Sequence, residues 1–154
     1  MNNIVKSGFI IFSLFISSIT YAAGISEKDV KSVMSKVDSA IANLDVKKVA
    51  STLSDNVTIT MNISMQGKTQ VMKPTKSQYI SMLQQGWSMY SNYKYNRSNV
   101  KINIKGSKAY VSADVSESMT VQGKTISGNS KEEIIVEVVN GKTLITSVTG
   151  YTTM

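Results

Sequence analysis

The sequence predicts an α+β domain in which three helices pack on one face of an antiparallel sheet. Up to about residue 54, and again from 75 to 90, apolar residues recur at intervals of three and four, which is typical of helices with one buried face. Between these segments, and everywhere after Tyr93, apolar and polar residues alternate, as in strands with one buried face. Because such a sheet needs a cover, the predicted order is α-α-β-β-α-β-β-β-β, with the helices as the cover.

Two helices are expected at the start of the domain. Ser26 can cap the first one, and Asp29 follows three residues later, where a capping box places its acid. The apolar stripe of this helix comprises Val30, Val33, Met34, Val37, Ile41 and Leu44. Asp45 is predicted to cap a second, shorter helix that ends at about Ser54.

A hairpin and a third helix follow. Residues 57–65 alternate between apolar and polar, Gly67 marks a turn, and residues 69–72 form a short return strand before Pro74. Thr75 and Gln78 then form a second capping box. The third helix carries Gly86 in its interior, which costs roughly 1 kcal/mol relative to alanine unless close packing requires glycine.

Four long strands complete the expected sheet. The first two cover residues 93–104 and 109–121, the third ends at Val139, and the last covers residues 144–152. Glycine stands in each turn between them, and Asn140-Gly141 is the strongest hairpin signal in the chain.

Residues 1–22 have the composition of a secretory signal peptide. Lys6 precedes an apolar run over residues 9–19, and Thr20 and Ala22 supply small residues at a cleavage site. A membrane-spanning helix needs roughly 20 apolar residues, and this run is about half as long and broken by serines. We therefore expect cleavage after Ala22, one domain over residues 23–154, and a periplasmic or secreted bacterial protein.

The composition limits the chemistry that the domain can perform. The chain has no cysteine, which excludes disulfides, and no histidine, so no metal or redox cofactor is expected. Removal of residues 1–22 leaves 132 residues. Lys6 is the only charged residue removed, so 16 cationic and 10 acidic residues remain and the net charge is +6. For an exported protein this charge favours an acidic protein or an anionic surface over nucleic acid as partner. Scattered lysines that only keep the domain soluble are the simpler alternative.

The passage from the first helix into the first strand, residues 41–57, carries a family resemblance. It reads Ile-Ala-Asn-Leu-Asp-Val-Lys-Lys-Val-Ala-Ser-Thr-Leu-Ser-Asp-Asn-Val. Its two apolar stripes, polar turn and Leu-Ser-Asp-Asn-Val step resemble the opening of the nuclear transport factor 2-like superfamily, which includes ketosteroid isomerases and polyketide cyclases. The strands after Tyr93 fit the same pattern. The resemblance implies a curved, cone-like sheet, a pocket between sheet and helices, and a homodimer through the sheet, but none of the family's catalytic residues can be matched here.

Glu117 is the one acid expected in apolar surroundings, because it is in phase with apolar residues of its strand. These residues are Val111, Ala113, Val115, Met119 and Val121. If this phase faces the cone, Glu117 can act as a general acid or base, with Tyr90 as a hydrogen-bond donor opposite. A bulge that turns Glu117 outward, or an ion pair with a lysine, is the alternative.

Six residues are candidates for lining a ligand pocket. Methionine adapts to irregular apolar ligands, and aromatic residues combine a large contact area with a polar tip. The candidates are Met61, Met65, Tyr79, Trp87, Tyr90 and Met119. Such residues can equally form an ordinary core.

Every second residue of the strand from Tyr93 to Lys105 is aromatic, cationic or amide-bearing. The residues on the other side of this strand include Val100, Ile102 and Ile104. We expect the aromatic, cationic and amide-bearing residues to form an outer face that binds a partner protein, since tyrosine and arginine are enriched at interface centres. The proposed contacts are Tyr93, Tyr95, Arg97, Lys101 and Lys105. A solvated sheet face is the alternative, and a bulge near Ser98 would turn part of this set inward.

Two classes of function follow from the sequence. The first is an exported, non-catalytic binding domain, which holds a small apolar ligand in the cone or docks a protein on the sheet, for example to neutralise a toxin. The second is an isomerase- or cyclase-like enzyme that uses Glu117. The absence of histidine and of recognisable paired acids favours binding.

Overall fold

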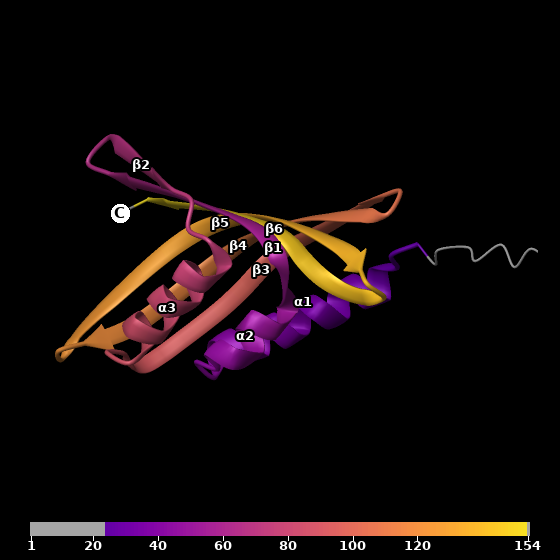
Figure 1. Cartoon of the computed structure of the whole chain (residues 1–154). Coiled ribbons are helices and arrows are strands. Elements are labelled where there is room, and N and C mark those ends of the chain that lie inside the picture. The colour runs from indigo at the N-terminus through magenta and orange to yellow at the C-terminus, as the bar shows by residue number, and fades with distance from the viewer. Residues whose placement is uncertain (1–23, 154) are drawn as a thin grey trace, which may run out of the picture.

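The computed structural model describes residues 24–153, which form three helices and one six-stranded sheet in the predicted order (Figure 1). The helices are α1 (Glu27–Ala42), α2 (Val46–Thr52) and α3 (Lys76–Trp87). The strands are β1 (Leu53–Met65), β2 (Lys68–Met72), β3 (Ser91–Lys105), β4 (Lys108–Val121), β5 (Lys124–Val139) and β6 (Lys142–Thr153). The expected signal peptide and its cleavage site lie outside the described residues.

The helix starts are capped as the sequence predicts. Ser26 and Asp29 form the capping box of α1, and Thr75 and Gln78 form that of α3. The Asp45 carboxylate accepts a hydrogen bond from the Lys48 backbone amide at 3.0 Å and so caps α2. Helix α2 ends two residues earlier than expected, because the chain is already extended at Leu53.

The sheet has the strand order β2-β1-β6-β5-β4-β3 and is curved around the helices (Figure 1). Neighbouring strands are antiparallel, as predicted, with one exception: β1 and β6 run parallel. Strands β3 to β6 form a meander, and its last strand returns beside β1 in the same direction. This return joins the N-terminal hairpin to the meander in one sheet.

Three of the hairpin turns have the geometry that the sequence predicts. Both turn residues have positive φ in each: 48° and 77° at Gln66-Gly67, 50° and 78° at Gln122-Gly123, and 50° and 75° at Asn140-Gly141. This backbone is that of the two-residue turns that match the twist of a hairpin and that favour Asn-Gly.

A β-bulge in β3 changes which side chains face the helices. Ser98 pairs with Asp114 and Lys101 with Ser112, so two residues of β3 oppose one residue of β4. Asn99 lies in this bulge with φ of 53°. Since side chains alternate between the two faces of a strand, the extra residue shifts the alternation between the two ends of β3.

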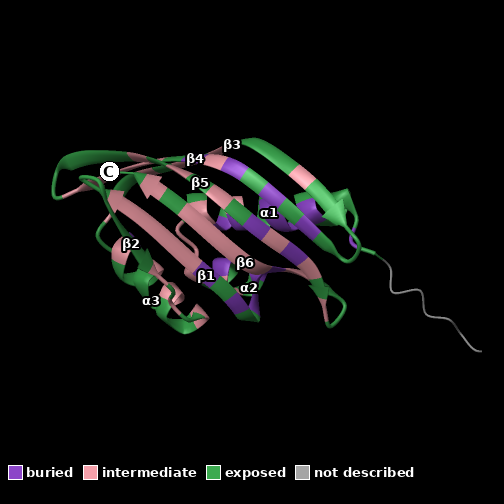
Figure 2. Ribbon diagram, turned by 90° about the horizontal axis from the view of Figure 1, so that it is seen from above, coloured by how far each residue is buried: buried purple, intermediate pink, exposed green. Residues whose placement is uncertain are grey.

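Helix α1 covers the core at one end of the sheet. Its residues Val30, Val33, Val37 and Ala40 are buried, as are the inner residues Val111, Ile134, Val136 and Ile145 of β4 to β6 (Figure 2). Val37 of α1 and Trp87 of α3 are buried in this core, whereas Ile41 of α1 and Leu83 of α3 are half-buried against it. No helix of residues 24–153 is long and apolar enough to cross a membrane.

The glycine inside α3 has a packing reason. A Cβ atom at Gly86 would lie 3.2 Å from the Tyr90 hydroxyl oxygen. Glycine at this position therefore lets the Tyr90 side chain fold back against the end of α3.

Candidate functional site

The first half of β3 directs Tyr93, Tyr95 and Arg97 toward the helices, so the expected position of these three residues on an outer face is wrong. The bulge at Asn99 is the physical reason, because it separates them in phase from the second half of the strand. Lys101 and Lys105 remain exposed, as predicted. The partner-binding role of the latter two residues stays a prediction.

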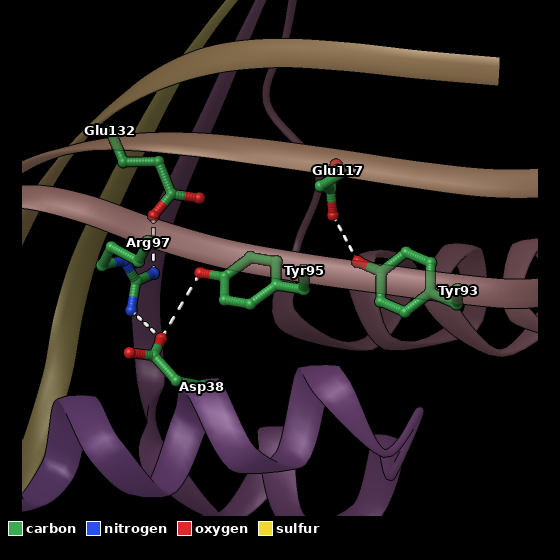
Figure 3. A network of polar contacts seen from close by, with 6 residues as sticks. All are labelled: Asp38, Tyr93, Tyr95, Arg97, Glu117 and Glu132. Atoms are coloured by element: carbon green, nitrogen blue, oxygen red, sulfur yellow. Dashed lines mark hydrogen bonds and ion pairs between the residues drawn. The ribbon is translucent and has the colours of Figure 1, made fainter.

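Arg97 connects α1 to β5 through two ion pairs (Figure 3). Its Nη1 atom donates to Asp38 of α1, and its Nη2 atom lies 2.7 Å from Glu132 Oε2. The Arg97 side chain is only 3% exposed. The Tyr95 hydroxyl also approaches Asp38, at 3.4 Å. A buried guanidinium needs such partners, because an unpaired buried charge is strongly destabilising.

Burial and charge act in opposite directions on this group of side chains. Burial raises the pKa of Asp38, and the Arg97 charge offsets only part of that effect. Burial works against the charge of Arg97, but Glu132, Tyr95 and Asp38 outweigh it and raise the Arg97 pKa. Burial also raises the pKa of Tyr95, which therefore keeps its proton at neutral pH.

Glu117 lies on the inner face, in the phase that the sequence predicts, and accepts a hydrogen bond from the Tyr93 hydroxyl (Figure 3). Burial and this hydrogen bond raise the pKa of Tyr93, so Tyr93 is a protonated donor at neutral pH. The sequence suggested Tyr90 as an oxyanion donor opposite Glu117, and no hydrogen bond of the Tyr90 side chain is found among residues 24–153. Tyr90 instead stacks on the Tyr93 ring, with 6.0 Å between ring centroids, and Trp87 lies 6.3 Å from it.

Tyr79 of α3 belongs to the same region. Burial, then the charges of Glu132 and Glu117, raise the pKa of its hydroxyl. Among residues 24–153 this hydroxyl makes no side-chain hydrogen bond. We refer to the group as the inner polar cluster, which comprises Asp38, Tyr79, Tyr93, Tyr95, Arg97, Glu117 and Glu132.

Two glycines leave unfilled space beside the acids of this cluster. Gly128 of β5 pairs with Glu117, and Gly150 of β6 pairs with Glu132, so each glycine shares the inner face with its acid. A Cβ atom at either glycine would have no other atom within 4 Å. Glu132 lies four positions after Gly128 in β5, which corresponds to roughly 13 Å of strand. We call this strip of the inner face the glycine trough.

The polar network beside the trough is also incomplete. The Arg97 Nε atom is buried and has no hydrogen-bond partner within residues 24–153. Buried donors are ordinarily paired with protein groups or ordered water. An acceptor from a ligand or a water molecule therefore fits next to Arg97.

The six predicted pocket residues are distributed around this region. Met61 pairs with Gly150 in β1, and Met119 pairs with Ile126 on the inner face near Gly128. Trp87 and Tyr90 form the aromatic cluster with Tyr93, and Tyr79 belongs to the inner polar cluster. Met65 is 54% exposed at the tip of the β1–β2 hairpin, away from the trough.

Sequence reasoning missed Asp38 and Glu132 as members of the site. Asp38 follows Met34 by four residues and precedes Ile41 by three, so it borders the apolar stripe of the first helix. Glu132 is in phase with Ile134 and Val136, the apolar residues of its strand. These spacings were the available signals. The described part of the chain contains no group of three or more acidic residues placed to hold a metal ion.

Several shallow hollows open on the surface, and two of them are alternatives to the trough. One is an open groove of about 720 Å³ between α1 and the β3 edge, which includes Asp38 and Tyr95. The other, of about 680 Å³, lies on the outer face and includes Lys101, Tyr110 and Ile135. These two hollows compete with the trough as positions for a ligand, as does a third hollow of about 660 Å³ whose lining includes Gly128 and Tyr151.

No protein-family model matches the sequence, and no curated protein sequence matches it. Solved structures do match. An NTF2-like protein from Cytophaga hutchinsonii is 18% identical, with 83% of this chain and 99% of that chain covered and a TM-score of 0.64. A hexachlorocyclohexane dehydrochlorinase is 13% identical (81% and 83% covered, TM-score 0.63). A putative scytalone dehydratase from Novosphingobium aromaticivorans is also 13% identical (82% and 83% covered, TM-score 0.64). At these identities the similarity concerns the fold, and the chain has the fold of the NTF2-like proteins.

Proposed function

We propose that this protein binds a small ligand with an apolar body in the glycine trough. The observation that carries the proposal is the unfilled space at Gly150, where no atom lies within 4 Å of the position that a side chain would take. An inner strand position beside a polar cluster is ordinarily filled, because protein interiors are close-packed. The half-buried Met61 beside Gly150 supplies an adaptable apolar wall.

The trough fits a ligand better than the outer hollow does. It lies on the face that the helices cover, and its polar groups are held in place by Arg97 and by the Tyr93–Glu117 hydrogen bond. Ligand sites commonly combine an apolar surface with a few oriented polar groups. The outer hollow also has an apolar lining, from residues such as Tyr110 and Ile135, but it lies on the face of the sheet that no helix covers and away from the inner polar cluster.

Filling the trough tests this function directly. Gly150→Leu places a side chain in the open space, and its φ is not positive, so the backbone tolerates the change. We expect this variant to weaken binding of 1-octanol at least ten-fold while the protein stays folded. Trp87, the only tryptophan, reports binding by its fluorescence, because it lies next to Tyr93.

Thr149→Leu is the matched control, since Thr149 is the neighbour of Gly150 on β6 and lines the outer hollow. It should leave 1-octanol binding unchanged. If Thr149→Leu abolishes 1-octanol binding and Gly150→Leu retains it, the ligand binds on the outer face. Absence of 1-octanol binding by the unmodified protein would contradict the proposal.

We also propose that the protein acts outside the cytoplasm, as the composition of residues 1–22 indicates. The exported chain should then begin at Ala23. Mass spectrometry of the protein recovered from the periplasm or medium measures this start. A mass that still includes residues 9–19 would contradict it.

A second candidate function is proton transfer by Glu117. The Tyr79 hydroxyl, which has no side-chain partner among the described residues, is a donor for a substrate carbonyl oxygen. Glu117 would then remove a proton from the carbon next to that carbonyl and return one from solvent. The similar structures named as a dehydrochlorinase and a dehydratase support an enzymatic use of this fold.

Hydrogen exchange distinguishes this enzyme from a binding protein. In deuterated water, an enzyme would accelerate deuterium uptake next to the carbonyl of 2-octanone, as measured by NMR, and Glu117→Gln would abolish the acceleration. Binding of 2-octanone without accelerated exchange would exclude proton transfer by Glu117 and would support ligand binding as the function.

A further inference from the structure

Glu117 is the inner carboxylate without a cationic partner. Asp38 and Glu132 share the guanidinium of Arg97. Within residues 24–153, Glu117 has no lysine or arginine nitrogen within 4.0 Å, and its hydrogen bond comes from the neutral Tyr93 hydroxyl. The inner polar cluster thus contains three carboxylates and one guanidinium. Its charge is opposite in sign to that of the whole chain, which is +7.

Aromatic rings pack against the tyrosine that binds this carboxylate. Tyr93 holds Glu117, the Tyr90 ring stacks on Tyr93, and the Trp87 ring is tilted against it at 46°. The faces of aromatic rings carry negative charge density and attract cations, most strongly when water is excluded. A carboxylate next to such rings favours an ammonium group over a neutral or anionic one.

The space at Gly128 makes Glu117 reachable. Gly128 is the residue opposite Glu117 in β5, and the position of its missing side chain is open. Glu117 and Gly128 are both half-buried, whereas Val115 in the same phase of β4 is buried. A ligand can therefore approach Glu117 from the trough without displacing a side chain at residue 128.

We propose that the ligand is a cation, in which an ammonium group binds Glu117 between the aromatic rings and an apolar body extends along the trough toward Gly150. This inference rests on the proposed binding function and specifies its ligand class. The excess negative charge of the cluster adds to the selection, because it repels anionic ligands. Lysines of the outer face, such as Lys101, do not determine the ligand, since they lie on the opposite side of the sheet from Glu117.

Three probes with one apolar body separate the effect of charge from that of the body. Octylammonium, 1-octanol and octanoate are titrated below micelle-forming concentrations, and Trp87 fluorescence gives each dissociation constant. We expect octylammonium to bind at least ten-fold more tightly than octanoate. Glu117→Gln should weaken octylammonium at least ten-fold and leave 1-octanol within two- to three-fold. Glu133→Gln, which removes an exposed acid on β5 from the outer face, is the control and should change neither.

The outcomes distinguish this inference from the function on which it rests. Equal binding of the three probes, or tightest binding of octanoate, overturns the inference and leaves the trough as an apolar site. Absence of binding by all three overturns both. An octylammonium preference that survives Glu117→Gln overturns the role of Glu117. If this variant does not fold, Gly128→Leu replaces it, and unchanged octylammonium binding in that variant contradicts the proposed position.

Discussion

Single residues of β3 determine which polar and charged groups lie on the inner face of the sheet. Alternation in the strand predicts Arg97 on the outer face, because the opposite phase holds Val100, Ile102 and Ile104. Its side chain is instead buried between Asp38 and Glu132. The alternation of residues from Tyr93 onward is visible in the sequence, but which of its sides faces the helices depends on a bulge. The sequence predicts the inner position of Glu117 correctly, because the residues on the same side of its strand are all apolar. No bulge lies between Val115 and Glu117 in β4, so this alternation is kept.

Replacing Arg97 should destabilise the protein strongly. Arg97→Met removes the cation that Asp38 and Glu132 share and leaves two carboxylates in a partly buried position. Breaking a buried ion pair by removing one partner costs about 3–5 kcal/mol. Lys101→Met, on the exposed half of the same strand, should change the free energy of unfolding by less than about 0.5 kcal/mol. Urea denaturation of both variants measures these values, and equal stabilities would contradict the buried role of Arg97.

The stability of the protein should depend on pH in opposite ways through Asp38 and Glu137. Burial raises the pKa of Asp38 in the folded state. The folded protein therefore binds this proton more tightly than the unfolded chain does. The resulting stabilisation is complete below the ordinary pKa of aspartate and is lost as pH rises through the folded-state pKa. The hydrogen bond from Thr146, with help from Lys108, lowers the pKa of Glu137. Its contribution is present above the ordinary pKa and is lost as pH falls through the folded-state value.

Two variants measure these opposite trends. Between about pH 3 and about pH 7, the free energy of unfolding of Asp38→Asn should rise relative to the unmodified protein, and that of Glu137→Gln should fall. Denaturant melts across this range give both differences. If the free-energy differences of both variants change in the same direction with pH, Asp38 is not held in a desolvated position.

At the scale of the elements, the sequence predicted what depends on local periodicity and missed what depends on pairing. Helices, caps and the Gly-containing turns follow from spacing and from backbone preferences, and the structure confirms them. The parallel pairing of β1 with β6 joins residues about 90 positions apart in the sequence and has no local signal. The same holds for Asp38 and Arg97, whose contact joins α1 to the middle of β3.

The bulge at Asn99 provides a test at this scale. Valine is favoured in strands, so strand propensity alone predicts that Asn99→Val stabilises β3. Asn99 has φ of 53°, however, where a β-branched residue is strained, and we expect a cost of about 1–2 kcal/mol. Asn96→Val, at a regularly paired and exposed position of β3, is the control and should be neutral or stabilising. A stabilising Asn99→Val would mean that the bulge is absent in solution.

At the scale of the whole molecule, the inner polar cluster has a charge opposite in sign to that of the chain. Lysines that give the chain its positive charge, such as Lys101 and Lys105, are exposed, whereas the inner polar cluster holds an excess of acid. Composition alone therefore suggested an acidic partner, because it cannot show on which side of a sheet each charge lies. The partner protein and the homodimer through the sheet stay predictions for the outer face.

Chemical-shift mapping with 1-octanol tests the central claim most directly, because it shows where on the sheet a ligand binds. In ¹⁵N-labelled protein, we predict that the largest shifts belong to the amides of Gly128, Gly150 and Met119 around the trough, whereas Tyr110 and Thr149 stay unchanged. The largest shifts at Tyr110, Ile135 and Thr149 would instead place the ligand in the outer hollow and contradict the account.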